Sequence, residues 1–144
     1  CPGHDGRLAH RMAKGYDVNR ERKLALSLFG KDLARRAKSK CELTGTSGVP
    51  LVTYEIPPIP REPDFERCLL VSEDVLRQLE QPQILRPVEW RHLNEIIWSD
   101  IPAVQAMALR ILRHLAPGEP WAQNLIEDSC LDPGVEALAT EASL

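Results

Sequence analysis

Of the four cysteines, Cys41 stands where a metal-binding knuckle would begin and Cys68 lies in a second, ribbon-like segment, but each stands alone. Neither is followed by a second cysteine at the Cys-x-x-Cys spacing. A structural zinc ion takes four thiolate or imidazole ligands in a tetrahedron, and this stretch supplies two thiols in the wrong arrangement. We therefore expect no metal and no other cofactor. The chain has to hold its fold by packing apolar side chains.

A chain of 144 residues is long enough to do so. At this length folding buries roughly 68–70% of the unfolded surface, so a single core is stable without a disulfide or a metal ion. The hydrophobic fraction of 43% and the charged fraction of 27% are typical of a soluble globular protein. No apolar run approaches the ~20 residues that cross a bilayer. We expect a cytoplasmic protein with free thiols and no membrane association.

Residues 1–11 carry no apolar periodicity, and Met12 is typical of a natural start. We expect residues 1–11 to be a non-native or disordered leader. The rest should divide into residues 12–86, a helix plus a ribbon, and residues 87–144, a helical region that packs with it as one unit.

The first expected element is an amphipathic helix over residues 19–39. Leu26, Phe29, Leu33 and Ala37 recur at spacings of three and four, which predicts one buried stripe. Basic residues crowd the end of this segment, where cations suit the helix dipole.

A two-stranded ribbon should follow. Residues 51–56 are β-branched and alternating, and residues 68–71 are apolar, so both are predicted strands. The proline-rich segment 57–63 cannot continue a ladder, because proline has no amide donor. Ser72 is placed to cap a short helix.

From Pro87 onward the apolar spacing is helical. We expect Asp100 to cap one of these helices, and Trp90, Trp98 and Trp121 to lie in the core. The predicted fold class is α+β, with an N-terminal helix, a small two-stranded ribbon and a C-terminal helical bundle.

The order of these segments resembles the PhnA-like zinc-ribbon family, named after an alkylphosphonate-utilisation operon. The resemblance runs from Met12 to the end of the sequence. It rests on Cys41-Glu42-Leu43, Tyr54-Glu55-Ile56-Pro57-Pro58, Cys68-Leu69-Leu70, Trp90-Arg91-His92-Leu93-Asn94 and Trp98-Ser99-Asp100-Ile101-Pro102-Ala103-Val104-Gln105.

The resemblance implies four ligand positions, at Cys41, Thr44, Ser72 and Val75, of which one keeps a thiol. Position 92, often Cys in that family, is His here. The family's small C-terminal barrel is not matched by this sequence. The resemblance thus implies a degenerate ribbon without zinc, in which Val75 joins the apolar core.

Charge is divided unevenly along the sequence. Residues 1–40 hold 11 Lys and Arg against 4 Asp and Glu, and residues 41–144 hold 7 against 17. The net charges of +7 and −10 add to the −3 of the whole chain. Such asymmetry indicates either an anionic partner for the basic end or attraction between the two ends, within or between molecules.

Catalysis has little support. A Cys–His pair would need Cys68 within reach of His92 or His114, but Cys68 lies in an apolar strand and both histidines lie on apolar helices. No phosphate-binding loop or dinucleotide fingerprint occurs.

Two hypotheses about function remain. The first is a non-catalytic binding or adaptor protein that contacts a protein partner or a second copy of itself. The alternative is a nucleic-acid-binding protein that uses the basic segment 20–40. Its contacts would be Lys31, Arg35, Arg36, Lys38 and Lys40.

Overall fold

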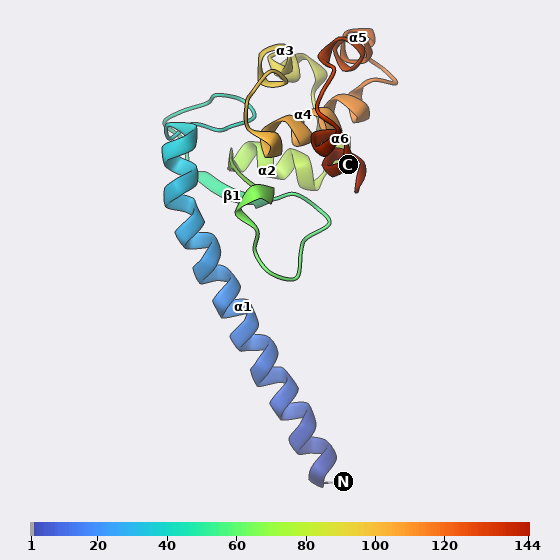
Figure 1. Ribbon diagram of the computed structural model, residues 1–144. Helices are drawn as coiled ribbons and strands as arrows, with labels where there is room; N and C mark the ends of the chain where they lie inside the picture. Colours follow the sequence, from blue (N-terminus) through green and yellow to red (C-terminus); the bar gives the residue numbers. More distant parts are fainter. Residues whose placement is uncertain (1) are drawn as a thin grey trace.

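The computed structural model describes the backbone of residues 2–144 and the side chains of residues 20–144 (Figure 1). The predicted leader, residues 1–11, has no described side chains, but the backbone of residues 2–11 belongs to α1, which begins at Pro2 rather than at residue 19. The α-helices and strands are α1 (Pro2–Ala37), β1 (Leu51–Glu55), β2 (Cys68–Ser72), α2 (Glu73–Glu80), α3 (Leu93–Ile96), α4 (Pro102–Leu115), α5 (Pro120–Ser129) and α6 (Pro133–Thr140). Short 3₁₀ turns are η1 (Phe65–Arg67), η2 (Pro82–Ile84) and η3 (Pro87–Trp90).

The predicted α+β class is confirmed. Strands β1 and β2 pair antiparallel, with Leu51 opposite Ser72 and Glu55 opposite Cys68. Ser72 then caps α2, because its hydroxyl accepts a hydrogen bond from the Val75 amide at 3.2 Å.

Strand β2 is buried along its whole length, and its two faces serve two different cores. Successive strand side chains point to opposite faces. Cys68 and Leu70 pack with Leu33 of α1, whereas Leu69 and Val71 belong to the main core. The ribbon is therefore closed by apolar packing on both sides, with α1 on one side of it and α2–α6 on the other (Figure 1).

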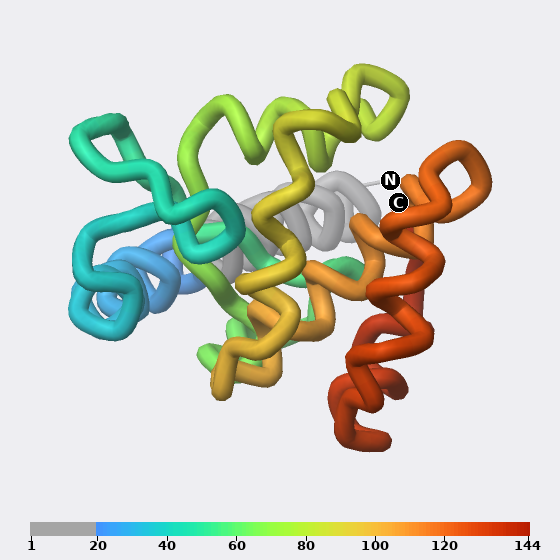
Figure 2. The backbone as a smooth tube through the Cα atoms, turned by 90° about the horizontal axis from the view of Figure 1, so that it is seen from above, coloured from blue at the N-terminus to red at the C-terminus, as the bar shows by residue number. Residues whose placement is uncertain are grey.

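Helix α4 is the centre of the main core. Every residue from Ala106 to Leu112 is buried, as expected of a helix that is covered on all sides. It packs against α3, α5, α6 and β2. In Figure 2 the described part of α1 and the last two helices lie at opposite sides of the molecule.

Besides the bounds of α1, three details differ from the sequence-based expectation. Trp98 is 58% exposed and is not a core residue. The N-cap of α4 is Ile101 rather than Asp100, and the Ser99 hydroxyl accepts from the Ile101 amide at 3.1 Å. The segment after Pro87 is broken into a 3₁₀ turn and a helix of 4 residues. In the described part of the chain, no helix combines the length and the apolar character that crossing a membrane requires.

Candidate functional site

Helix α1 ends in a left-handed turn rather than running on to residue 39. Lys38 and Ser39 have φ angles of 56° and 58°, and the Ser39 amide bonds to the Ala34 carbonyl at 2.9 Å. Each non-glycine residue in this region costs about 1–2 kcal/mol, because its Cβ crowds the next carbonyl. This turn carries the chain out of α1 with Lys38 and Lys40 exposed.

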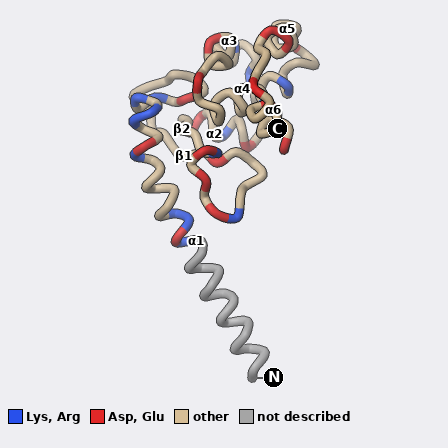
Figure 3. The backbone as a smooth tube through the Cα atoms, in the orientation of Figure 1, with Lys and Arg blue, Asp and Glu red and all other residues tan. Residues whose placement is uncertain are grey.

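Four of the five basic residues predicted from the sequence form an exposed group at this end of α1. We call them the basic surface: Lys31, Arg35, Lys38 and Lys40. Among residues 20–144, the one ion pair that any of them makes joins Arg35 to Asp32 at 3.9 Å, between side chains that are 83% and 64% exposed. A pair this exposed contributes little. Figure 3 shows Lys and Arg gathered where α1 ends, with Asp and Glu spread over the remaining described chain.

Arg36, the fifth predicted residue, points the other way. Its Nε and Nη2 donate to the two carboxylate oxygens of Glu42 at 2.9 and 2.8 Å, and Nη2 also donates to the Cys68 carbonyl at 3.0 Å. Its guanidinium carbon lies 5.3 Å from the centre of the Phe65 ring. Arg36 therefore ties α1 to β2, and its cationic end is turned away from the basic surface.

Glu42 holds the same junction from the other side. Its Oε1 accepts from the Leu70 amide at 2.8 Å, and its own amide donates to the Leu70 carbonyl at 2.8 Å. The sequence did not lead us to this role. One signal was available: Glu42 is the single acidic residue between Asp32 and Glu55, and it follows the basic end of the helix.

Of the four ligand positions implied by the resemblance, Thr44, Ser72 and Val75 border one cavity of about 300 Å³. Cys41 and Val75 are both packed in the main core and are 1% and 2% exposed, so Val75 joins the apolar core as expected. The Gly45 amide bonds to the Cys41 carbonyl at 2.7 Å, which closes a tight turn at residues 41–45.

These residues do not fit a zinc ion. Their side chains provide one thiol, two hydroxyls and an aliphatic group, and the Ser72 hydroxyl is already engaged in capping α2. Zinc takes thiolate, imidazole or carboxylate ligands. Within residues 20–144, no group of three or more His, Cys, Asp and Glu side chains is placed to hold a metal ion.

The candidate catalytic residues, Cys68, His92 and His114, are engaged in packing or in hydrogen bonds to backbone carbonyls. Burial, followed by the negative charges of Glu55 and Asp64, raises the pKa of the Cys68 thiol to about 11, and its Sγ donates to the Asp64 carbonyl at 3.3 Å. A thiol that keeps its proton is a poor nucleophile. His92 Nε2 bonds to the Leu43 carbonyl at 2.7 Å, and His114 Nε2 to the Pro82 carbonyl at 3.2 Å.

Comparison of the chain with protein-family models, with curated proteins and with solved structures finds no match.

Proposed function

We propose that this chain is a non-catalytic cytoplasmic binding protein, related to the PhnA-like family through a degenerate zinc ribbon, and that its basic surface binds the phosphate backbone of nucleic acid. One observation carries the proposal. Lys31, Arg35, Lys38 and Lys40 are all exposed, whereas Arg36 beside them is used inside the fold. Lysine and arginine side chains that neutralise phosphates release counterions, which favours binding.

The surroundings of the basic surface favour contact with the backbone rather than with bases. Single-strand binding platforms combine cations with aromatic side chains on which bases stack. Phe29 of α1 and Phe65, whose ring lies beside Arg36, pack edge-to-face on each other with ring centres 5.5 Å apart. We therefore expect duplex binding that does not depend on sequence.

A protein partner, including a second copy of the chain, is the other candidate. It is favoured by Leu24 and Leu28, which are 60% and 65% exposed and lie four residues apart on α1. Residues at this spacing share one helix face. The net charge of −10 on residues 41–144 would attract the basic end of another copy.

Fluorescence anisotropy with a labelled DNA duplex at low salt tests the proposal. The test variant is Arg35→Glu with Lys40→Glu, which spares Arg36 and its role in the fold. The matched control is Arg61→Glu with Arg77→Glu, an equal charge change at exposed residues elsewhere. We expect the test variant to lose at least about tenfold in affinity.

The control should bind as the parent does. Equal losses in both variants would show that net charge alone matters and would refute the assignment to the basic surface. No binding by the parent, with dimers that Leu24→Glu and Leu28→Glu dissociate in light scattering, would favour self-association instead.

A further inference from the structure

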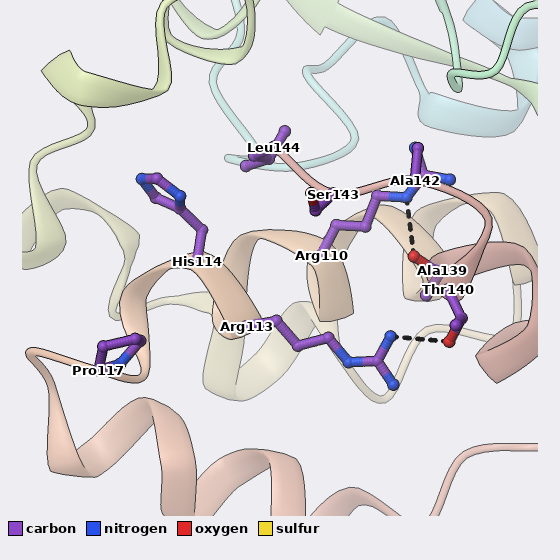
Figure 4. Close-up of a pocket in the computed structure, with 9 residues that line it drawn as sticks. All are labelled: Arg110, Arg113, His114, Pro117, Ala139, Thr140, Ala142, Ser143 and Leu144. Atoms are coloured by element: carbon purple, nitrogen blue, oxygen red, sulfur yellow. Dashed lines mark hydrogen bonds between the residues drawn. The ribbon is translucent and has the colours of Figure 1, made fainter.

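A cavity of about 640 Å³ lies between the end of α4 and the segment that follows α6 (Figure 4). Its walls are formed by Arg110, Arg113, His114, Pro117, Ala139, Thr140, Ala142, Ser143 and Leu144. This size is within the range of about 300–1,000 Å³ typical of small-molecule sites.

The ionisable side chains that line the cavity are basic, whereas the part of the chain that forms it, residues 41–144, is acidic overall. Residues 41–144 carry a net charge of −10. Yet three of the lining side chains are basic, from Arg110, Arg113 and His114, and none is acidic. Helix ends account for part of this, because basic side chains suit the last turn of α4.

Arg110 is held in place by two backbone carbonyls. It is 2% exposed, and its Nε and Nη2 donate to the carbonyls of Ala139 and Leu138 at 3.0 and 2.8 Å. A guanidinium carries five N–H groups on three nitrogens. In the part of the chain that the structure describes, Nη1 makes no hydrogen bond, and Arg110 contributes a buried positive charge to the wall of the cavity.

Two further side chains are fixed around the same space. Arg113 Nη1 donates to the Thr140 hydroxyl at 3.0 Å, and that hydroxyl donates to the Glu136 carbonyl at 2.7 Å. His114 projects from α4 on the other side of the cavity from Arg113 (Figure 4). Its Nε2 donates a hydrogen bond to the Pro82 carbonyl at 3.2 Å, because a carbonyl oxygen can only accept. This leaves Nδ1 without a partner in the described chain.

The remaining wall is apolar. Pro117, Ala139, Ala142 and Leu144 present carbon surface to the cavity. A ligand that matches both parts needs an oxyanion at one end and a short apolar body at the other. A guanidinium pairs well with either carboxylate or phosphate oxygens.

We propose that this cavity binds a small amphipathic organic anion, a carboxylate or a phosphate monoester with a short alkyl body. The site is independent of the nucleic-acid proposal, because it uses other residues.

Two-dimensional amide NMR of the labelled protein tests this with four probes: octanoate, hexyl phosphate, inorganic phosphate and octylammonium. We expect octanoate, hexyl phosphate or both to give saturable shifts at residues 110–117 and 138–144. Which of the two binds tighter identifies the preferred oxyanion. Inorganic phosphate should bind more weakly, and octylammonium should not bind there.

Arg113→Glu is the test variant and Arg61→Glu the matched control, since both replace an exposed arginine with the same change in charge. Arg113→Glu should weaken binding at least about tenfold, since it replaces a charge-assisted donor with a like charge. His114→Gln, which keeps a hydrogen-bonding side chain, should weaken binding without altering the fold.

No saturable shift with either amphipathic anion would overturn the proposal. So would shifts that map outside the cavity, or equal weakening by Arg61→Glu. Inorganic phosphate binding as tightly as hexyl phosphate would overturn the apolar half of the site.

Discussion

The guanidinium of Arg36 and the carboxylate of Glu42 form a two-point ion pair across the end of α1, with N–O distances of 2.9 and 2.8 Å. The Glu42 side chain is 3% exposed and that of Arg36 is 20% exposed. Because the pair also reaches the backbone of Cys68 and Leu70, it fixes where α1 meets the ribbon. It therefore sets the position of the exposed cations beside it.

Arg36→Ala should destabilise the protein by about 3 kcal/mol, because it leaves the Glu42 carboxylate buried without its counterion. Arg35→Ala is the matched control, one residue away on the exposed face. Its effect should stay within about 0.5 kcal/mol. Urea unfolding followed by circular dichroism gives both values. Equal effects of the two substitutions would mean that the ion pair does not hold the helix in place.

Ser39→Gly should stabilise the protein by about 0.5–1 kcal/mol, since glycine adopts the positive φ of 58° without steric cost. The charges of the basic surface are unchanged by this substitution. Ala34→Gly, in the last turns of α1, should instead destabilise by about 1 kcal/mol. Thermal unfolding of the two variants separates these effects. A destabilising Ser39→Gly would contradict the left-handed turn.

The raised pKa of Cys68 predicts a protected thiol. At pH 8 the folded protein holds almost all of this thiol in the protonated form, since its pKa is about 11. Alkylation by iodoacetamide, followed by peptide mass spectrometry, should label exposed Cys130 at least about 100-fold faster than Cys68. Comparable rates would show that Cys68 is open to solvent.

The same shift links stability to pH. The folded state holds the Cys68 proton more tightly than the unfolded state, whose pKa is near 9.0. This contribution is fully present below pH 9 and is lost as the pH rises through about 11. Cys68→Ala should make the decline in unfolding free energy over that pH range less steep. An unchanged decline would mean that other groups cause the pH dependence.

Metal content tests the proposal that the ribbon holds its fold without zinc. The parent chain, purified after growth with zinc, should contain no stoichiometric zinc and should melt at the same temperature with and without a chelator. A variant with Thr44→Cys, Ser72→Cys and Val75→Cys restores the thiols that the family resemblance implies, and we expect it to take up one zinc ion. One zinc per parent chain, with chelator-sensitive unfolding, would contradict this account.

The sequence predicted the elements better than their packing partners. The alternation in residues 51–56 and the apolar run in 68–71 identified both strands within one residue of their ends. The stripe of Leu26, Phe29 and Leu33 correctly identified the face of α1 that packs on the ribbon. Both signals are repeats of apolar residues along the sequence, and the spacing of such repeats follows from the local geometry of a strand or a helix.

The candidate site was predicted less completely, because charge alone does not reveal a partner. Arg35 and Arg36 are neighbours of the same type, but a turn of about 100° between successive helical residues puts one in water and the other against Glu42. Trp98 was wrongly assigned to the core for a related reason, since α3 is too short to define a face. The cavity beside α4 depends on residues far apart in sequence, which no local pattern identifies.

The salt dependence of DNA binding tests the central claim most directly. If the four residues of the basic surface each contact a phosphate, a plot of log affinity against log salt concentration should have a slope of about −3.6 for duplex DNA, from roughly −0.9 per contact. The double substitution Arg35→Glu with Lys40→Glu should make the slope shallower, by an amount that corresponds to the loss of about two phosphate contacts. A slope that the double variant leaves unchanged, or a parent protein that does not bind DNA at low salt, would contradict the account.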